Sequence, residues 1–274
     1  MSPFLFILFL ITQTIPACAE HFTFKLVTPE ADFSAKQITE LLYRAKMEAP
    51  LDLSGRDLTY LDLSNLDFKK ARLSHADLYG TDFTNANLKE ADLSWTRLDR
   101  AVLIRTNLSN ANLESATLYR PTIYSDLTND GKDAPVFLGA NLKRIKVQAE
   151  LSGSNFHGAD LSEADFHPLE DRPGEGTLVT LRKNVLKSCD FSGAKLIKAN
   201  FSEAVLTFSK MTNADLTGAN FSGADLSKVD FRSSLLTDAN FSGADVEGAN
   251  FLGSHGLESV KGLEQAQNLE KAIR

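Results

Sequence analysis

Aspartates and histidines are the residues of this sequence that could act in acid–base catalysis or bind a metal. The five histidines are scattered and lack the spacing of a metal site. Many aspartates precede a large apolar residue at one fixed position of a repeat, as Asp77, Asp92, Asp215 and Asp225 do. We expect these aspartates to form hydrogen bonds at the surface of the repeat. The sequence therefore predicts no catalytic residue, no cofactor and no metal site.

One segment resembles the first half of a calcium-binding loop. Residues 126–133 carry oxygen-bearing side chains at alternate positions, and Gly131 stands at the sixth position. Phe137 occupies the twelfth position, where such a loop requires glutamate. An ordinary turn of Asp, Asn and Gly residues fits the segment better.

The elements that position all of these residues follow from a period of five. A large apolar residue recurs at every fifth position from Leu53 to Ile123 and again from Leu181 to Phe251, and the residue two positions earlier is usually small. Inward positions spaced by two and three fit neither a helix nor a flat strand. Each pentad is then one short side and one corner, and four pentads close a square. The stretch ANFSGAD recurs at this interval of four pentads, from Ala219 and from Ala239.

The run of A-[DN]-[LF]-x-x pentads resembles the pentapeptide-repeat family. The resemblance implies an all-β fold, a right-handed quadrilateral β-helix, over residues 51–253. In that fold Phe201, Phe221 and Phe241 should stack inside, and Asn220 and Asn240 should form a ladder outside. The resemblance is specific for the fold and says little about activity.

Two loops interrupt the repeat, at 125–136 and 167–180. The repeat resumes between them in a shifted register at Leu142, Leu151, Phe156, Leu161 and Phe166. Residues 124–180 contain 5 basic and 10 acidic residues, so most of the net charge of −7 lies around the loops. Both loops should project from the surface.

Both ends of the solenoid are expected to be covered. Residues 20–50 form an N-terminal segment with a capping α-helix from Ser34 to Glu48, which begins at a capping box of Ser34 and Gln37 and a hydrophobic staple of Phe33 and Ile38. Residues 254–274 form a helical C-terminal tail of one or two short turns that covers the other end. Because open solenoid ends invite stacking, the ends are also where the protein could form oligomers.

Residues 1–19 have the features of a secretory signal peptide. An apolar run from Phe4 to Ile11 is followed by Ala17-Cys18-Ala19, which predicts cleavage after Ala19, although no Lys or Arg precedes the run. A lipid anchor at Cys18 is disfavoured because Pro16 fits a lipobox poorly. The mature protein is thus expected to be exported, periplasmic or extracellular, and free of the membrane. Cys189 is then its single cysteine, so no disulfide can form within the chain.

A coil of four pentads gathers one group of side chains on a single face. His75 and Trp95 share one position of adjacent coils, Tyr79 and Tyr119 share the adjoining column, and Tyr60, Arg100 and Arg120 share the column beside it. Trp, Tyr and Arg are the residue types that dominate binding hot spots. These seven residues are the predicted partner-binding face.

These features together predict a non-enzymatic exported scaffold that binds a protein, with a glycan as the alternative partner. An exported effector that acts on a host cell has the same sequence features. The family resemblance also implies a further alternative, because some cytosolic members mimic B-DNA and bind DNA gyrase. That alternative requires a cytosolic, strongly anionic rod, whereas these repeat faces are nearly neutral. The net charge of −7 also argues against binding to nucleic acid.

Overall fold

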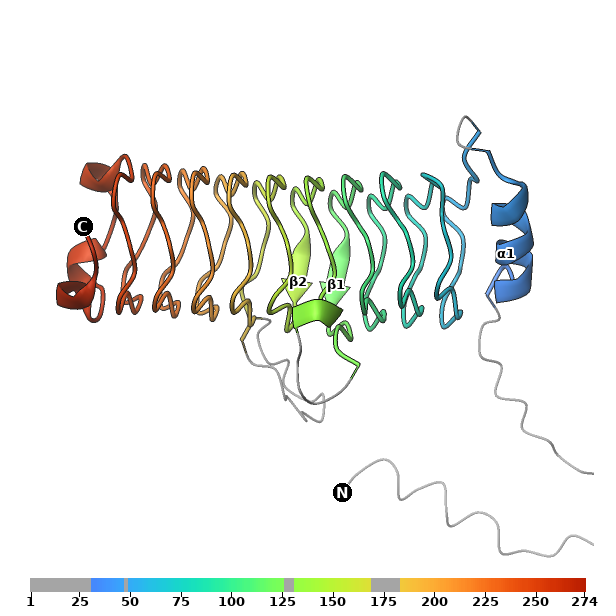
Figure 1. Ribbon diagram of the computed structural model, residues 1–274, viewed down its shortest axis with the longest axis horizontal. Coiled ribbons are helices and arrows are strands. Elements are labelled where there is room, and N and C mark those ends of the chain that lie inside the picture. Colours follow the sequence, from blue (N-terminus) through green and yellow to red (C-terminus); the bar gives the residue numbers. More distant parts are fainter. Residues whose placement is uncertain (1–30, 47–48, 126–130, 169–182) are drawn as a thin grey trace, which may run out of the picture. The chain divides into compact units, whose positions relative to one another are not determined.

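The computed structural model describes residues 31–46, 49–125, 131–168 and 183–274. The predicted signal peptide lies outside the described residues. Residues Ala31–Arg274 form one compact unit, in which the chain winds through coils stacked along one axis (Figure 1). None of the helices described is both long enough and apolar enough to span a bilayer.

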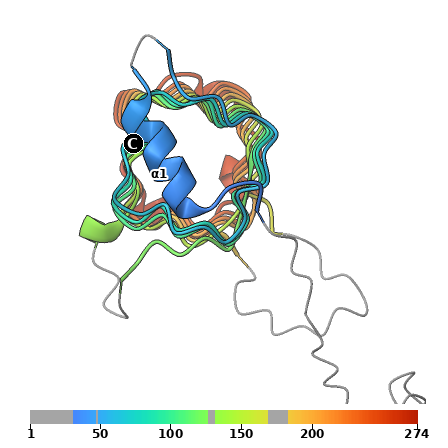
Figure 2. The same cartoon turned by 90° about the vertical axis from the view of Figure 1, so that its right-hand side faces the viewer.

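Parallel pairing between successive coils builds the wall of this unit. In the first two coils, Leu53 donates its amide to the carbonyl of Arg72 at 2.8 Å, and Arg72 donates to Leu51 at 2.8 Å. Viewed along the axis, the stacked coils have a four-sided outline (Figure 2). We number the sides first to fourth after the pairs that begin them: Asp52 with Arg72, Asp57 with Asp77, Asp62 with Asp82, and Asp67 with Asn87. The chain is therefore a β-helix whose circuit takes four pentads where no insertion occurs.

The aspartates that precede the central apolar residues bind the backbone, as the sequence predicted. The Oδ1 atom of Asp77 accepts the amide of Tyr79 at 3.1 Å, and that of Asp225 accepts the amide of Ser227 at 3.0 Å. Asp92 and Asp215 make the same contact with residues Ser94 and Thr217. These hydrogen bonds stabilise the corners of the coil and occupy the carboxylates.

The interior is a continuous column of large and small apolar side chains. Phe201 and Phe221 stack with ring centroids 5.5 Å apart, and Phe221 and Phe241 follow at 5.3 Å. Outside them, Asn240 donates its side-chain amide to Asn220 at 3.2 Å. Both predicted ladders are present. In the small position, Thr81 donates its hydroxyl to the carbonyl of Leu58 at 2.8 Å, whereas the buried hydroxyl of Ser154 has no hydrogen-bond partner among the described residues.

The first insertion shifts the register because the coil after it is one residue short. Asn107 pairs with Val136, and Val136 pairs with Asn155, one residue earlier than four full pentads would give. The short side contains strand β2 (Lys146–Gln148), which pairs in parallel with strand β1 (Thr117–Tyr119). Of the predicted loop 125–136, residues 126–130 lie outside the described residues, Gly131–Asp133 form the 3-10 helix η2, and Val136 already belongs to the wall.

Two interior residues of the shifted coil do not fit the predicted pattern. Phe137, noted in the sequence only as the residue that spoils a calcium loop, is fully buried and stacks on Phe156 at 4.8 Å. Val147 is also buried. The second insertion separates Glu150 from its pairing partner Val185, and most of it, residues 169–182, lies outside the described residues.

Helix α1 (Ala35–Arg44) lies at the N-terminal end of the stacked coils (Figure 1). Ser34 and Gln37 form the predicted capping box, and Ile38 and Leu42 are buried in the core cluster. The helix ends at Arg44 rather than at Glu48, because the ammonium of Lys69 binds the carbonyl of Leu42 at 2.8 Å and the chain then turns. The positive charge of Lys69 near the C-terminus of α1 also interacts favourably with the helix dipole.

The C-terminal tail continues the wall beyond residue 253. It contains three 3-10 helices, η3 (Leu257–Ser259), η4 (Leu263–Gln265) and η5 (Leu269–Lys271). Between them, His255, Lys261, Gln267 and Ile273 pair with the preceding coil. The steps between these residues are six rather than five. The tail is thus an additional, wider coil with a 3-10 turn in its corners, whereas one or two helical turns were expected.

Candidate functional site

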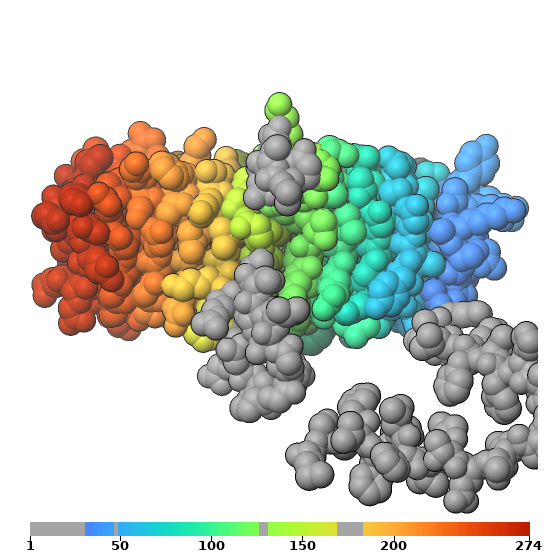
Figure 3. All heavy atoms as spheres, turned by 90° about the horizontal axis from the view of Figure 1, so that it is seen from below, coloured from blue at the N-terminus to red at the C-terminus, as the bar shows by residue number. Residues whose placement is uncertain are grey.

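The structure brings the seven predicted face residues to the second side and its two corners. His75 and Trp95 lie at the corner that precedes this side, and the amide of His75 donates to Ser94 in the next coil. The other five lie at the corner that follows it, where the amide of Tyr60 donates to the carbonyl of Tyr79 at 3.0 Å. We call this group the aromatic face: Tyr60, His75, Tyr79, Trp95, Arg100, Tyr119 and Arg120. In Figure 3 the coils form successive bands across the surface, which gives any such group a regular spacing.

The exposed aromatic rings of this face are held in place by neighbouring rings. His75 and Trp95 are stacked with nearly parallel rings, with 7° between their planes and 6.0 Å between centroids. Tyr60 contacts Tyr79 edge-on at 5.4 Å. The Tyr60 ring also occupies the space above Gly80, where a Cβ atom would approach it to 2.7 Å. Trp95 nevertheless remains 57% exposed and Tyr60 72% exposed.

Several of these residues adopt a backbone conformation that favours glycine. The second residue of each corner has a positive φ, which Gly55 and Gly80 supply without a Cβ. His75, Trp95 and Arg100 adopt φ values of 60°, 61° and 58°. The left-handed conformation costs a residue with a Cβ about 1–2 kcal/mol. Corners elsewhere in the wall also place residues other than glycine in this conformation, so the cost is not particular to this face.

Arg97 is a member of the site that the sequence did not reveal. Its guanidinium binds both carboxylate oxygens of Asp77, at 2.9 and 2.6 Å, and lies 4.7 Å from the centre of the Tyr79 ring. Arg97 occupies the position that the repeat usually fills with Asp or Asn. In the sequence, this contact could have been predicted from an arginine in that position one coil after Asp77. It fixes the Tyr79 ring between a cation and Tyr60.

Tyr119 is one of the two members of the aromatic face that are only partly exposed. It is half-buried, and burial together with the charge of Asp99 raises the pKa of its phenol. Its amide donates to the carboxylate of Asp99 at 3.1 Å. Tyr119 is therefore neutral at physiological pH and contributes an uncharged, partly apolar surface beside Arg120.

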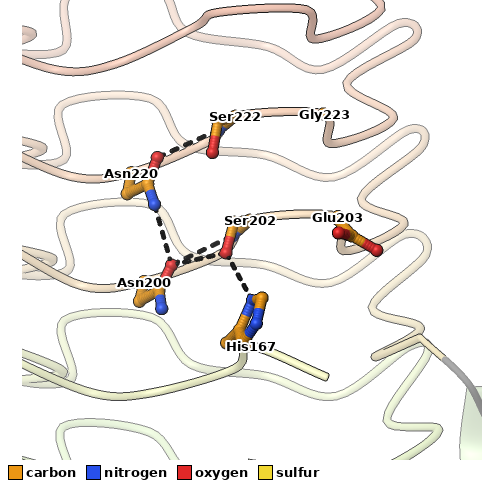
Figure 4. Close-up of a pocket in the computed structure, with 7 residues that line it drawn as sticks. All are labelled: His167, Asn200, Ser202, Glu203, Asn220, Ser222 and Gly223. Carbon is orange, nitrogen blue, oxygen red and sulfur yellow. Dashed lines mark hydrogen bonds between the residues drawn. The ribbon is translucent and has the colours of Figure 1, made fainter. Parts of the chain in front are cut away.

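A polar groove lies farther along the same side and corner (Figure 4). It has a volume of about 480 Å³ and is lined by His167, Asn200, Ser202, Glu203, Asn220, Ser222 and Gly223. The Nδ1 atom of His167 lies 2.8 Å from the hydroxyl of Ser202, which in turn donates to Asn200 at 2.8 Å. Nothing in the sequence indicated this groove, because an insertion separates His167 from the other lining residues.

The contact between His167 and Ser202 has the distance of a base and a nucleophile. The hydroxyl of Ser202 is committed to Asn200, however, and no carboxylate of the described residues binds the other ring nitrogen of His167. Catalysis of this type needs a group that orients the base. The groove therefore offers hydrogen bonds to a polar ligand rather than an activated serine. No group of three or more His, Cys, Asp or Glu residues that could hold a metal occurs within the described ranges.

Asp133, the last residue of the calcium-like segment, serves another purpose. Its carboxylate accepts the amide of Ser125 at 3.0 Å and also binds the Ser125 hydroxyl and the Arg105 guanidinium. These hydrogen bonds, first of all those from Ser125, hold the pKa of Asp133 below its ordinary value of 3.8. The other oxygen-bearing residues of the segment lie outside the described residues.

We predict that Asp133→Asn loosens the base of the first insertion at neutral pH. Because the folded pKa is lowered, the stabilisation from Asp133 is present above its unfolded pKa and is lost as pH falls through the folded value. Hydrogen exchange of residues 131–136 should accelerate in the variant at pH 7, and the difference from wild type should shrink only as pH falls below about 4, towards the lowered pKa of folded Asp133. Asp238→Asn, an exposed corner aspartate, is the control. Equal protection of both proteins at pH 7 would contradict the prediction.

Cys189 is a structural rather than a reactive thiol. It occupies a small interior position, is fully buried, and donates to the carbonyl of Leu151 at 3.2 Å. Burial raises the pKa of the thiol. We predict that, in a Cys18→Ser background, the native protein does not react with a disulfide reagent at pH 8 and reacts fully in denaturant. Ser222→Cys in the same background should react at once. Fast labelling of native Cys189 would disprove this assignment.

Comparison with known proteins agrees with the geometry. A family model described as pentapeptide repeats matches residues 52–85, 86–120, 147–167, 185–223 and 214–253, in 8 copies. The chain belongs to the pentapeptide-repeat family. The matched ranges lie within the paired coils, and pentapeptide-repeat residues form both the aromatic face and the polar groove. The family assignment explains the fold and leaves the partner open.

Solved pentapeptide-repeat proteins resemble this one at low sequence identity. HetL from the cyanobacterium Nostoc sp. strain PCC 7120, involved in regulation of heterocyst differentiation, is 24% identical, with 88% of this chain and 94% of HetL covered and a TM-score of 0.42. A trypsin-treated variant of QnrB1, a plasmid-mediated fluoroquinolone resistance protein, is 16% identical, with coverages of 68% and 89% and a TM-score of 0.33. A thylakoid-lumen protein of Arabidopsis thaliana is 28% identical, with coverages of 44% and 66% and a TM-score of 0.19. A search of curated proteins found no match.

Proposed function

We propose that this pentapeptide-repeat protein is a non-enzymatic scaffold that binds a protein partner through the aromatic face. The observation that carries the proposal is the combination of exposure and fixed geometry at Trp95 and Tyr60. Each ring is more than half exposed, and each is held by a second ring on a regularly paired coil. Rigid aromatic side chains lose little conformational entropy on binding, which is why they dominate hot spots.

A protein fits this face better than a glycan does. The rings of Trp95 and Tyr60 lie at opposite corners of the second side, and charged Arg97 stands between them beside Tyr79. A side of mixed aromatic and ionic character matches the composition of protein interfaces. A glycan that stacks on the flat pair of His75 and Trp95 is the alternative, and the binding experiment below distinguishes it.

We further propose that the coils form a quadrilateral, right-handed β-helix closed by α1 at one end and by the tail at the other. Residues 1–19 are proposed to direct export, which would place the scaffold in the periplasm or outside the cell. Sequencing of the mature N-terminus tests the export proposal. We expect Glu20 as the first residue, and a mature chain that begins at Met1 would refute export by a cleaved signal.

Capture of the partner tests the role of the aromatic face. We expect the double variant Tyr60→Ala/Trp95→Ala to bind a purified partner at least tenfold more weakly than wild type, because hot-spot aromatics contribute about 2 kcal/mol or more each. The matched control is Tyr43→Ala/Phe208→Ala, which removes two equally exposed aromatic residues from α1 and from another corner. Calorimetric titration measures the affinity, and melting curves check that both variants remain folded.

Two outcomes would contradict the proposal. The first is equal affinity of wild type and the Tyr60→Ala/Trp95→Ala variant. The second is loss of binding only in the Tyr43→Ala/Phe208→Ala control, which would place the partner on a different surface. If a glycan is recovered in place of a protein, the aromatic face is still the binding site, and its partner is a glycan.

A further inference from the structure

Three cations lack an ionic partner among the described residues: Arg100 and Arg120, which belong to the aromatic face, and Lys146 on the second side. No ion pair in the described part of the chain involves Arg100, Arg120 or Lys146. Other cations of this region are paired, since Arg97 binds Asp77 at 2.6 Å, Lys143 lies 3.4 Å from Asp160, and Arg144 binds Glu114. The unpaired group is therefore distinct from the charged surface around it. We call it the cationic cluster.

The pairing of the coils brings the three cations close together. Arg100 and Arg120 occupy the same corner position of consecutive coils, and the amide of Arg100 donates to Tyr119 at 2.8 Å. Lys146 pairs with Thr117 one coil farther along the second side. Adjacent coils are separated by about one strand spacing, roughly 4.8 Å. Like charges stacked at that spacing repel each other.

At two other places the wall pairs opposite charges at the same separation. Lys70 and Glu90 stand one coil apart with 2.5 Å between their charged atoms, and Asp77 and Arg97 repeat the arrangement. Asp57 stacks on Asp77 with the same charge, but both carboxylates accept backbone amides. The stacked arginines have no ion pair among the described residues. They also stand out in a chain whose net charge is −7. A local arrangement that disfavours the free protein is typical of a binding site.

We infer that the cationic cluster of Arg100, Arg120 and Lys146 docks an acidic segment of the protein partner. The inference rests on the proposed function and specifies the chemistry of the partner. Guanidinium groups bind carboxylates in a bidentate manner, and two arginines in register can receive carboxylates presented along an extended chain. Half-buried Tyr119 supplies apolar surface in the adjoining column, and exposed Trp95 and Tyr60 receive the apolar side chains of the same segment.

Carboxylates of a polypeptide fit better than the phosphates of a nucleic acid. Asp99 and Asp165 are close enough to influence Tyr119, so three cations are offset by two acids near the cluster. Such a small positive excess suits a few carboxylates, whereas a nucleic acid carries one charge per phosphate and would also meet the net negative charge of the chain. An anionic glycan is the competing source of carboxylates, and the experiment separates the two.

The test uses a short fluorescent peptide of alternating Glu and Gly, added to the full chain and followed by polarisation. We expect saturable binding that weakens as salt is raised, and no binding of the peptide in which Gln replaces Glu. Arg100→Gln/Arg120→Gln should bind at least tenfold more weakly. Lys195→Gln/Lys210→Gln removes the same charge from two other sides and should bind as wild type does.

Stability gives a second readout that a purely structural role would not produce. Because stacked arginines repel, Arg120→Gln should raise the melting temperature by about 1 °C at low salt while it weakens peptide binding. The gain should disappear at high salt. A lower melting temperature of Arg120→Gln would show that the arginines stabilise the free protein, and would overturn the inference.

The remaining outcomes separate this inference from the proposed function. Binding of an oligogalacturonate but not of the Glu peptide would assign the cluster to a glycan and overturn the inference. Equal peptide binding by wild type and Arg100→Gln/Arg120→Gln would also overturn it. If no peptide binds while Tyr60→Ala/Trp95→Ala still loses the purified partner, the aromatic face stands and its acidic partner segment is refuted.

Discussion

Phe221→Ala is expected to lower the free energy of unfolding by about 3–5 kcal/mol, the largest effect of any single substitution considered for this protein. The Phe221 ring is fully buried and contacts the rings of Phe201, Phe231 and Phe241 at centroid distances of 5.5, 6.0 and 5.3 Å. The backbone on both sides is fixed by coil-to-coil hydrogen bonds, so the coil cannot collapse onto the cavity. The free-energy cost of the cavity therefore adds to the free energy lost when the ring is no longer buried.

The loss should be local as well as large. Each coil of a solenoid contacts only its neighbours, so damage at one coil is transmitted mainly to the adjacent coils. Hydrogen exchange should accelerate around residues 199–243 and remain slow in the coils around Leu73 and Leu93. Ser222→Ala, one residue away at a corner, should change the free energy of unfolding by no more than about 0.5 kcal/mol. Uniform loss of protection along the whole wall would contradict this expectation.

The sequence predicted the wall wherever the circuit keeps its full length. The positions of Phe201, Phe221 and Phe241 follow from a period that the backbone obeys without interruption, so the interior stack and the outer asparagine ladder could both be stated in advance. Phe137 and Val147 could not be assigned in the same way. They lie five residues before and after Leu142, but the step from Val147 to Leu151 is four, so the period that resumes at Leu151 does not reach them.

The candidate site was predictable only in part for a related reason. A fixed period places Trp95 beside His75 and Tyr79 near Tyr60, and the structure shows both contacts. Arg97 was missed because its meaning depends on a side-chain conformation, a reach back to Asp77 in the previous coil. His167 meets Ser202 across an insertion of unpredictable path. Spacing fixes which backbone positions are neighbours, whereas the contacts of long side chains and of interrupted coils depend on three-dimensional packing.

The second large effect concerns the N-terminal end of the wall. There the first coil presents unpaired backbone groups at Asp52, Asp62 and Asp67, because no earlier coil of the described residues supplies partners. Asp32 pairs with the remaining side, donating its amide to Asp57 at 2.7 Å and accepting from Asp57 at 3.0 Å. Helix α1 adds Ile38 and Leu42 to the core above this coil. We therefore propose that α1 protects an edge that would otherwise pair with a second molecule.

Ile38→Asp/Leu42→Asp is expected to displace α1 and to convert the protein into oligomers that grow with concentration. Burial of two carboxylates against an apolar core is strongly unfavourable, so the helix should leave its position while the coils remain paired. Thr39→Asp/Tyr43→Asp introduces the same two charges at the same spacing on the exposed face of α1 and should retain the wild-type mass. Light scattering coupled to gel filtration measures the mass, and circular dichroism checks the wall. A displaced helix with an unchanged mass would show that the first coil is not adhesive, and α1 would then stabilise the end without guarding it.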